Sequence, residues 1–129
     1  MNPKIEKTIE LNPDSVTPEK LKILQKFKFN RLSIGIQSLI DSELTFLGRI
    51  HTQKKALFAL RLIQEADFQN YNVDLIFGLP DSSLQTIEKN LTKILEYQPT
   101  HISTYALTLE KGTRFFQKNI QKAPASLEL

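Results

Sequence analysis

Five side chains have the chemical types and the places in the chain needed to bind a polar small molecule. Four stand at or near the carboxyl ends of strand-like runs, and the fifth, an arginine, follows a Leu-Gly turn. They are Glu10, Gln37, Asp74 and Thr108, with Arg49 as the arginine. Carboxylates, an amide and a hydroxyl suit ribose hydroxyls and an amino group, and an arginine can pair with a carboxylate through two hydrogen bonds. The set predicts a ligand that combines an amino acid with a nucleoside.

Each residue also has a structural interpretation. Glu10 could cap a turn or pair with a lysine, and Gln37 could satisfy loop backbone. Arg49 could be an exposed cation that interacts with the dipole at a helix end. Asp74 favours a function more strongly, because it stands in an apolar run and an unpaired acid is costly to bury.

The elements that position these residues centre on a strand over residues 31–37. Leu32, Ile34 and Ile36 alternate there with small or polar residues. Successive side chains of a strand point to opposite faces, so one face is apolar and the other is polar. The same alternation marks strands over residues 5–11, 73–77 and 102–109. A sheet with an apolar back and a polar, glycine-containing front suits a buried polar ligand.

Helix signals separate these strands. Thr17, followed by proline, and Thr52 are expected N-caps of the first and third helices. The second, short helix is expected to be capped at Asp41 or Ser42, and the fourth at Ser82 or Ser83. A last helix is expected to begin near residue 113.

The alternation of strands and helices predicts right-handed crossovers and a parallel sheet. Four such units are too few to close a barrel, which takes about 250 residues. Strands in a doubly wound sheet are apolar on both faces, and these are not. We therefore predict an α/β fold, a partial (β/α) barrel of about four βα units.

Composition limits the classes of function. The chain has 129 residues, a net charge of +3 and no cysteine. The length fits one domain with a core. The lysines are scattered, so nucleic-acid binding is not favoured. No membrane span or signal peptide is visible, and cytoplasm is the expected location. Without cysteine there is no disulfide and no thiolate-held metal, and the two histidines do not have zinc-site spacing.

Five motifs in order resemble a known family. They are residues 9–13 (IELNP), 30–38 (NRLSIGIQS), 47–51 (LGRIH), 74–80 (DLIFGLP) and 107–113 (LTLEKGT). Together they are similar to the oxygen-independent coproporphyrinogen III oxidase family of radical S-adenosylmethionine (SAM) proteins. The motifs at 47–51 and 107–113 look more like its haem-chaperone branch.

The resemblance implies a partial (β/α) barrel and two cofactors, SAM and a [4Fe-4S] cluster. It also implies that Glu10, Gln37, Arg49 and Asp74 contact SAM and that Thr108 approaches it. The family's reaction is the oxidative decarboxylation of coproporphyrinogen III in haem biosynthesis, so a porphyrinogen or haem is an implied partner of the parent protein.

One departure from the family is large. The family's three cluster cysteines, and a glycine-rich segment upstream, have no counterpart here. We therefore interpret residues 1–123 as a fragment of the barrel that supplies part of the SAM-binding face and is inactive alone, with a tail at 124–129. Asp67 also stands where a glycine normally ends the helix, which predicts an altered helix end.

A second hypothesis needs no catalysis. A non-catalytic βα module could use its polar strand faces in protein assembly, because fold does not imply function. Open sheet edges also predict that the isolated half-barrel self-associates.

Overall fold

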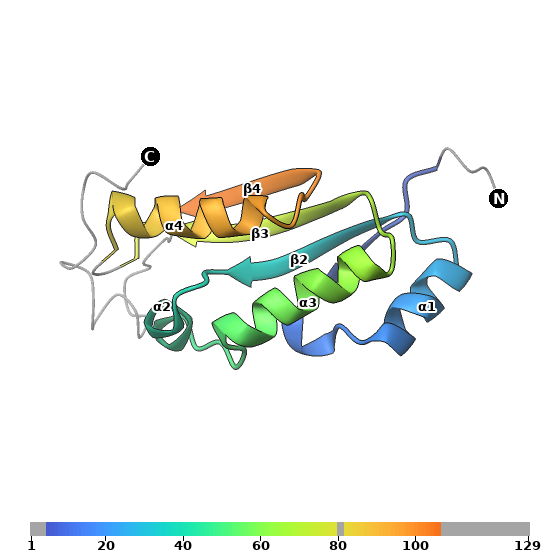
Figure 1. Ribbon diagram of the computed structural model, residues 1–129, viewed down its shortest axis with the longest axis horizontal. Helices are drawn as coiled ribbons and strands as arrows, with labels where there is room; N and C mark the ends of the chain where they lie inside the picture. Colours follow the sequence, from blue (N-terminus) through green and yellow to red (C-terminus); the bar gives the residue numbers. More distant parts are fainter. Residues whose placement is uncertain (1–4, 80–81, 107–129) are drawn as a thin grey trace, which may run out of the picture.

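The computed structural model describes residues 5–79 and 82–106 as a four-stranded sheet with helices. The strands are β1 (Thr8–Leu11), β2 (Arg31–Gln37), β3 (Tyr71–Phe77) and β4 (His101–Ala106). All neighbouring strands are parallel, in the order β1-β2-β3-β4 (Figure 1). Sequential order with parallel pairing is the arrangement of consecutive units of a (β/α) barrel, so the predicted fold class is confirmed.

The helices fall between the strands. A short 3₁₀ helix, η1 (Pro13–Ser15), precedes α1 (Pro18–Lys26). Two helices, α2 (Asp41–Phe46) and α3 (Gln53–Glu65), follow β2, and α4 (Leu84–Leu95) follows β3. The helices of the described ranges are not long and apolar enough to cross a lipid bilayer. The expected last helix, the end of the fourth strand and the domain boundary near residue 123 lie outside the described residues.

The hydrophobic core lies on one face of the sheet. Leu32, Ile34 and Ile36 of β2 are fully buried, and they join Val73 and Leu75 of β3 in one cluster. All three longer helices contribute to it, through Leu21, Leu24, Ala56, Ala59, Leu60, Ile63 and Ile94. Burial of these side chains is the main favourable term for the fold. The helices of the described ranges do not cover the opposite face of β2 and β3.

The N-cap residues predicted from the sequence are correct for three of the four α-helices that the structure describes. The hydroxyls of Thr17, Thr52 and Ser83 accept hydrogen bonds from the backbone of α1, α3 and α4. The expected cap of α2 was wrong, because Ile40 holds the N-cap position and Asp41 is the first helical residue. Asp41 instead accepts a hydrogen bond from the backbone N–H of Gln53, 2.8 Å away, at the start of α3. Its carboxylate therefore satisfies a donor of a different helix.

The ends of α1 and α3 use left-handed residues that are not glycine. Asp67, at φ 63°, follows α3, and Lys28, at φ 67°, follows α1. Next to Asp67, the N–H of Phe68 donates to the carbonyl of Ile63 at 3.3 Å, which closes the loop of a Schellman motif. The sequence predicted an altered helix end at Asp67. The hydrogen bonds there are those of an ordinary helix end, and the difference is that a residue with a side chain stands where glycine is favoured.

Candidate functional site

The open face of the sheet carries two rows of small and polar residues. Register pairs Glu10 with Ser33, Ser33 with Asn72, and Asn72 with His101. One step further along the strands, Gly35 pairs with Asp74 and Asp74 with Ser103. Partners in parallel strands point to the same face. The polar residues of four strands therefore share one surface.

The end of β2 is reshaped by a γ-turn at Gln37. Gln37 has φ 69°, and the Ser38 N–H donates to the Ile36 carbonyl at 2.8 Å. This conformation is rare and strained for a residue with a side chain. The ring Nε2 of the buried His51 lies 3.0 Å from the same carbonyl and donates a second hydrogen bond to it. His51 thus has a structural role at this turn.

A buried polar network fixes the chain just after this turn. The Ser38 hydroxyl donates to Glu43 Oε1 at 2.6 Å and accepts from the Ile40 N–H at 3.0 Å. The side chain of Asn90 accepts from the Leu39 N–H at 3.2 Å. In the part of the chain that the structure describes, no buried side-chain polar atom lacks a partner. The network ties the end of β2 to α2 and α4, so the strained turn is held on several sides.

Gly35 leaves space that the Gln37 side chain uses. A Cβ built on Gly35 would lie 2.8 Å from Gln37 Nε2, closer than real Cβ contacts. The amide of Gln37 therefore lies against the backbone of Gly35 on the open face. Glycine allows this close approach, and a Cβ there would require the end of the Gln37 side chain to move.

These features form a polar hollow of about 320 Å³. Its lining residues are Glu10, Leu11, Asn12, Ser33, Gly35, Gln37 and Asp74. Three predicted site residues, Glu10, Gln37 and Asp74, come together in it from three strands. Glu10 is exposed, Asp74 is half-buried and Gln37 is buried. The hollow presents hydrogen-bond acceptors and an amide to whatever enters it.

Of the other two predicted residues, only Arg49 lies in the part of the chain that the structure describes. Arg49 is exposed after α2 and is not among the lining residues. Thr108 lies outside the described residues. Asn72 of the polar face was missed by the sequence analysis, and Asn12, which lies in the 9–13 motif and lines the hollow, was not chosen as a site residue. The sequence does contain a signal for Asn72. Asn72 stands two residues before Asp74, so it belongs to the same alternation, and it lies one residue before the expected start of the third strand at 73.

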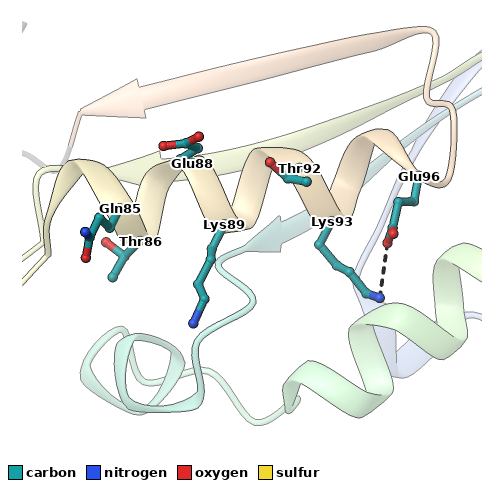
Figure 2. A pocket seen from close by; sticks show the side chains of 7 residues that line it. All are labelled: Gln85, Thr86, Glu88, Lys89, Thr92, Lys93 and Glu96. Carbon is teal, nitrogen blue, oxygen red and sulfur yellow. Dashed lines mark ion pairs between the residues drawn. The ribbon is translucent and has the colours of Figure 1, made fainter.

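A second hollow, of about 480 Å³, runs along α4. Figure 2 shows its seven labelled side chains, all from this helix and its C-terminal end, with Lys93 and Glu96 paired at 3.1 Å. Because one helix supplies every one of them, the hollow is a surface groove in which polar groups do not converge. We do not assign a ligand to it.

The two implied cofactors differ in how well they fit the polar hollow. Carboxylates at Glu10 and Asp74 suit a ligand with a positive charge and hydroxyl groups, as SAM has. A [4Fe-4S] cluster does not fit, because it is held by thiolates and the chain has no cysteine. No group of three acidic, histidine or cysteine residues suited to a metal exists within residues 5–79 and 82–106.

The fold and the hollow define a class: a parallel half-barrel with a polar hollow on its open face. The Radical SAM superfamily profile matches residues 1–94, and the chain belongs to this superfamily. Relatives support a branch within it. Heme chaperone HemW of Bacillus subtilis is 39% identical over 108 residues, covering 84% of this chain and 28% of the relative. HemW of Haemophilus influenzae is 40% identical over 111 residues, covering 86% and 29%.

Solved structures agree. Coproporphyrinogen III oxidase (HemN) from Escherichia coli, a radical SAM enzyme, superposes with a TM-score of 0.74 at 27% identity, over 83% of this chain and 25% of that one. Elp3 from Methanocaldococcus infernus, at 22% identity and a TM-score of 0.77, shares the fold over 88% of this chain and 27% of that one. The predicted resemblance to this family, on its haem-chaperone side, is confirmed. The chain spans less than a third of the length of the relatives it matches.

Proposed function

We propose that the polar hollow is part of a SAM-binding face. One observation supports this most directly: Glu10, Gln37 and Asp74, separated along the chain, line one hollow over Gly35 in a member of the Radical SAM superfamily. The two carboxylates accept hydrogen bonds from the ribose hydroxyls and the amino group, and the Gln37 amide supplies both a donor and an acceptor.

Arg49 and Thr108 complete the proposed set. Arg49 would reach the carboxylate of the ligand from its exposed position after α2, where the guanidinium can form a bidentate pair. Thr108 is proposed from the resemblance alone.

The cluster belongs to the parent protein in this proposal. Superfamily membership implies SAM and a [4Fe-4S] cluster, and these 129 residues supply no thiolate for it. When bound, a cluster supplies the electron for SAM cleavage. The chain's own residues bind and orient SAM, and we propose that residues 1–123 act in this way as one barrel fragment, inactive alone, with a tail at 124–129.

We further propose that the parent protein carries haem or acts on a porphyrinogen in the cytoplasm. HemW relatives are named as heme chaperones, and the E. coli structure is of a coproporphyrinogen III oxidase. Identity near 40% to HemW, against 27% to the oxidase, favours haem carriage. Oxidative decarboxylation of coproporphyrinogen III is the second possibility.

Calorimetric titration of the chain with SAM tests the proposed site. The wild-type chain is expected to bind saturably. Asp74→Asn, which keeps the shape and removes the charge, should weaken binding at least about tenfold, because it removes a charge-assisted acceptor. Asp67→Asn is the matched control, since Asp67 is exposed, lies at a helix end and tolerates asparagine at its positive φ. Equal affinity of Asp74→Asn and the wild type would contradict the proposal.

A second function, assembly, has its own observation. A hollow of about 560 Å³ follows β1 and α1, lined in part by Ile9, Ile23 and Leu24. Ile23 and Phe27 of the same region are more than half exposed. Exposed apolar side chains beside a strand favour association. Sedimentation at high concentration should therefore show a dimer of half-barrels, and a monomer at every concentration would contradict this.

A further inference from the structure

The side chain of Asn72 is buried at the centre of the open face, next to Asp74. Asn72 is 2% exposed and its amide has four hydrogen-bond partners. Its Nδ2 lies 2.7 Å from Asp74 Oδ1 and 3.0 Å from the Ser33 hydroxyl. Its Oδ1 lies 2.7 Å from His101 Nδ1 and 3.0 Å from the Ser103 hydroxyl. An amide has two N–H donors and one oxygen with two lone pairs, so its full capacity is used.

Chemistry fixes which way this amide points. A carboxylate only accepts hydrogen bonds, so the atom facing Asp74 must be the nitrogen. The oxygen then faces His101, whose Nδ1 carries the proton. Ser103 donates to the same oxygen. Asn72 is therefore held by three strands in the one orientation that offers a donor to Asp74.

Few other groups restrain the Asp74 carboxylate. Its register neighbour on β2 is Gly35, which has no side chain, and its neighbour on β4, Ser103, is turned to Asn72. Among residues 5–79 and 82–106, Asn72 gives the only hydrogen bond to this carboxylate. Without Asn72, a half-buried acid at the wall of the hollow would be free to change rotamer.

We propose that Asn72 is a positioning residue for the ligand site: it fixes the Asp74 carboxylate in the orientation that receives the ligand. This inference rests on the proposed SAM-binding function and adds to it a residue that does not line the hollow. Asn72 acts through Asp74, and His101 and Ser103 act through Asn72. The orientation of a binding carboxylate is thus set from the neighbouring strand β4.

Replacing the amide by an acid gives a sharp test. In Asn72→Asp, the introduced carboxyl group can still donate to Asp74 while it is protonated, whereas its ionised form repels Asp74. Two carboxylates in contact ionise one after the other, so the SAM affinity of the variant relative to that of the wild type should fall as pH rises. The charged and titratable groups facing this pair are Glu10 from β1 and His101 from β4; β2 contributes Ser33 and Gly35, which do not titrate.

SAM affinity is measured by calorimetry at about pH 5.5 and about pH 8. At each pH, the affinity of a variant is divided by that of the wild type, so that the effect of titrating SAM itself cancels. Asn72→Asp should bind within about threefold of the wild type at the lower pH and at least about thirtyfold more weakly at the higher pH. Asn70→Asp is the matched control: Asn70 is exposed and precedes β3, so the same charge change should leave the ratio constant.

A second variant covers the case in which Asn72→Asp does not fold. Asn72→Ser removes the Asp74 donor without adding charge, and it should weaken SAM binding about tenfold at both pH values. Thermal melts verify that each variant is folded. A ratio that does not vary with pH in folded Asn72→Asp, or wild-type affinity in Asn72→Ser, overturns the inference and leaves the proposed function standing. No SAM binding by the wild-type chain overturns both.

Discussion

Alternate residues of β2 enter two different environments. Leu32, Ile34 and Ile36 pack into the core under the helices, whereas Ser33, Gly35 and Gln37 line the polar hollow. Core burial is non-directional, and a side chain of similar volume can replace another there at modest cost. On the open face, each polar atom needs a partner at a defined distance and angle.

The comparison teaches where stability and binding reside. The apolar face holds most of the burial that stabilises the chain, while the polar face holds hydrogen bonds whose net worth is small but whose geometry matters. Substitutions on the first face should therefore change the free energy of unfolding, and those on the second should change ligand affinity.

Ile34→Ala on the apolar face should have the largest effect on stability. Ile34 is fully buried between strands and helices, so truncation should cost about 2–5 kcal/mol. Urea denaturation measures it, with Ser33→Ala on the opposite face as the control. Ser33→Ala removes one hydrogen bond with Asn72 and should cost about 1 kcal/mol. Equal losses in the two variants would contradict the division between the faces.

Tyr71 is the polar exception on the apolar face. Its hydroxyl donates to the Tyr97 carbonyl. Burial, with a smaller contribution from the charge of Tyr97, raises the pKa of Tyr71 from 10.0 to about 12. The folded state therefore keeps a proton that the unfolded state loses, so this stability is fully present below pH 10 and is lost as pH rises towards 12. The loss should be roughly 2–3 kcal/mol.

Denaturation series across that pH range, with ultraviolet detection of tyrosinate, test this prediction. Tyr71→Phe is the control and should lose the late-ionising tyrosine and the associated slope. A tyrosine that ionises early in the folded wild type, with an unchanged slope in the variant, would show that the hydroxyl is not held as described.

Gly35→Ala should affect binding more than stability. The added Cβ would lie 2.8 Å from Gln37 Nε2, and the end of that flexible side chain must move away. SAM affinity should fall about tenfold, and the free energy of unfolding should change by about 1 kcal/mol or less, because a side-chain end gives way more easily than backbone. Calorimetry and urea denaturation together measure both. A large loss of stability with unchanged affinity would reverse the assignment of this face.

Asp67→Gly should have the smallest effect, because Asp67 belongs to neither face. Its φ of 63° disfavours a side chain, so glycine should stabilise the chain by about 0.5–1 kcal/mol. The melting temperature should rise, and SAM affinity should stay constant. Asp67→Ala, which keeps a Cβ, is the control and should give no increase. A fall in stability with glycine would mean that the Asp67 side chain contributes contacts that outweigh the strain.

Local patterns made much of the fold predictable. Alternation in residues 31–37 and hydroxyl residues before apolar stripes identified strands and caps, because period and capping depend on neighbouring residues alone. The cap of α2 was missed because Asp41 is used by α3, a contact between separate helices. Glu10, Gln37 and Asp74 were predicted for one site, and they line one hollow, since the carboxyl ends of parallel strands lie at one edge.

Local patterns could not give the detail of the site. The γ-turn at Gln37 depends on His51, which reaches the Ile36 carbonyl from fifteen residues away. The orientation of Asp74 depends on Asn72, and that of Asn72 on His101 and Ser103 of another strand. Arg49, chosen for its chemistry, is exposed and does not line the hollow.

The sequence by itself determined the two-faced strands, the parallel order of the βα units and, through the lack of cysteine, that these residues hold no thiolate-ligated cluster. Only the tertiary structure decided which polar side chains meet and how each is turned. The physical reason is that hydrophobic alternation is encoded over a few neighbouring residues, whereas hydrogen bonds between strands depend on the register that packing sets between distant segments.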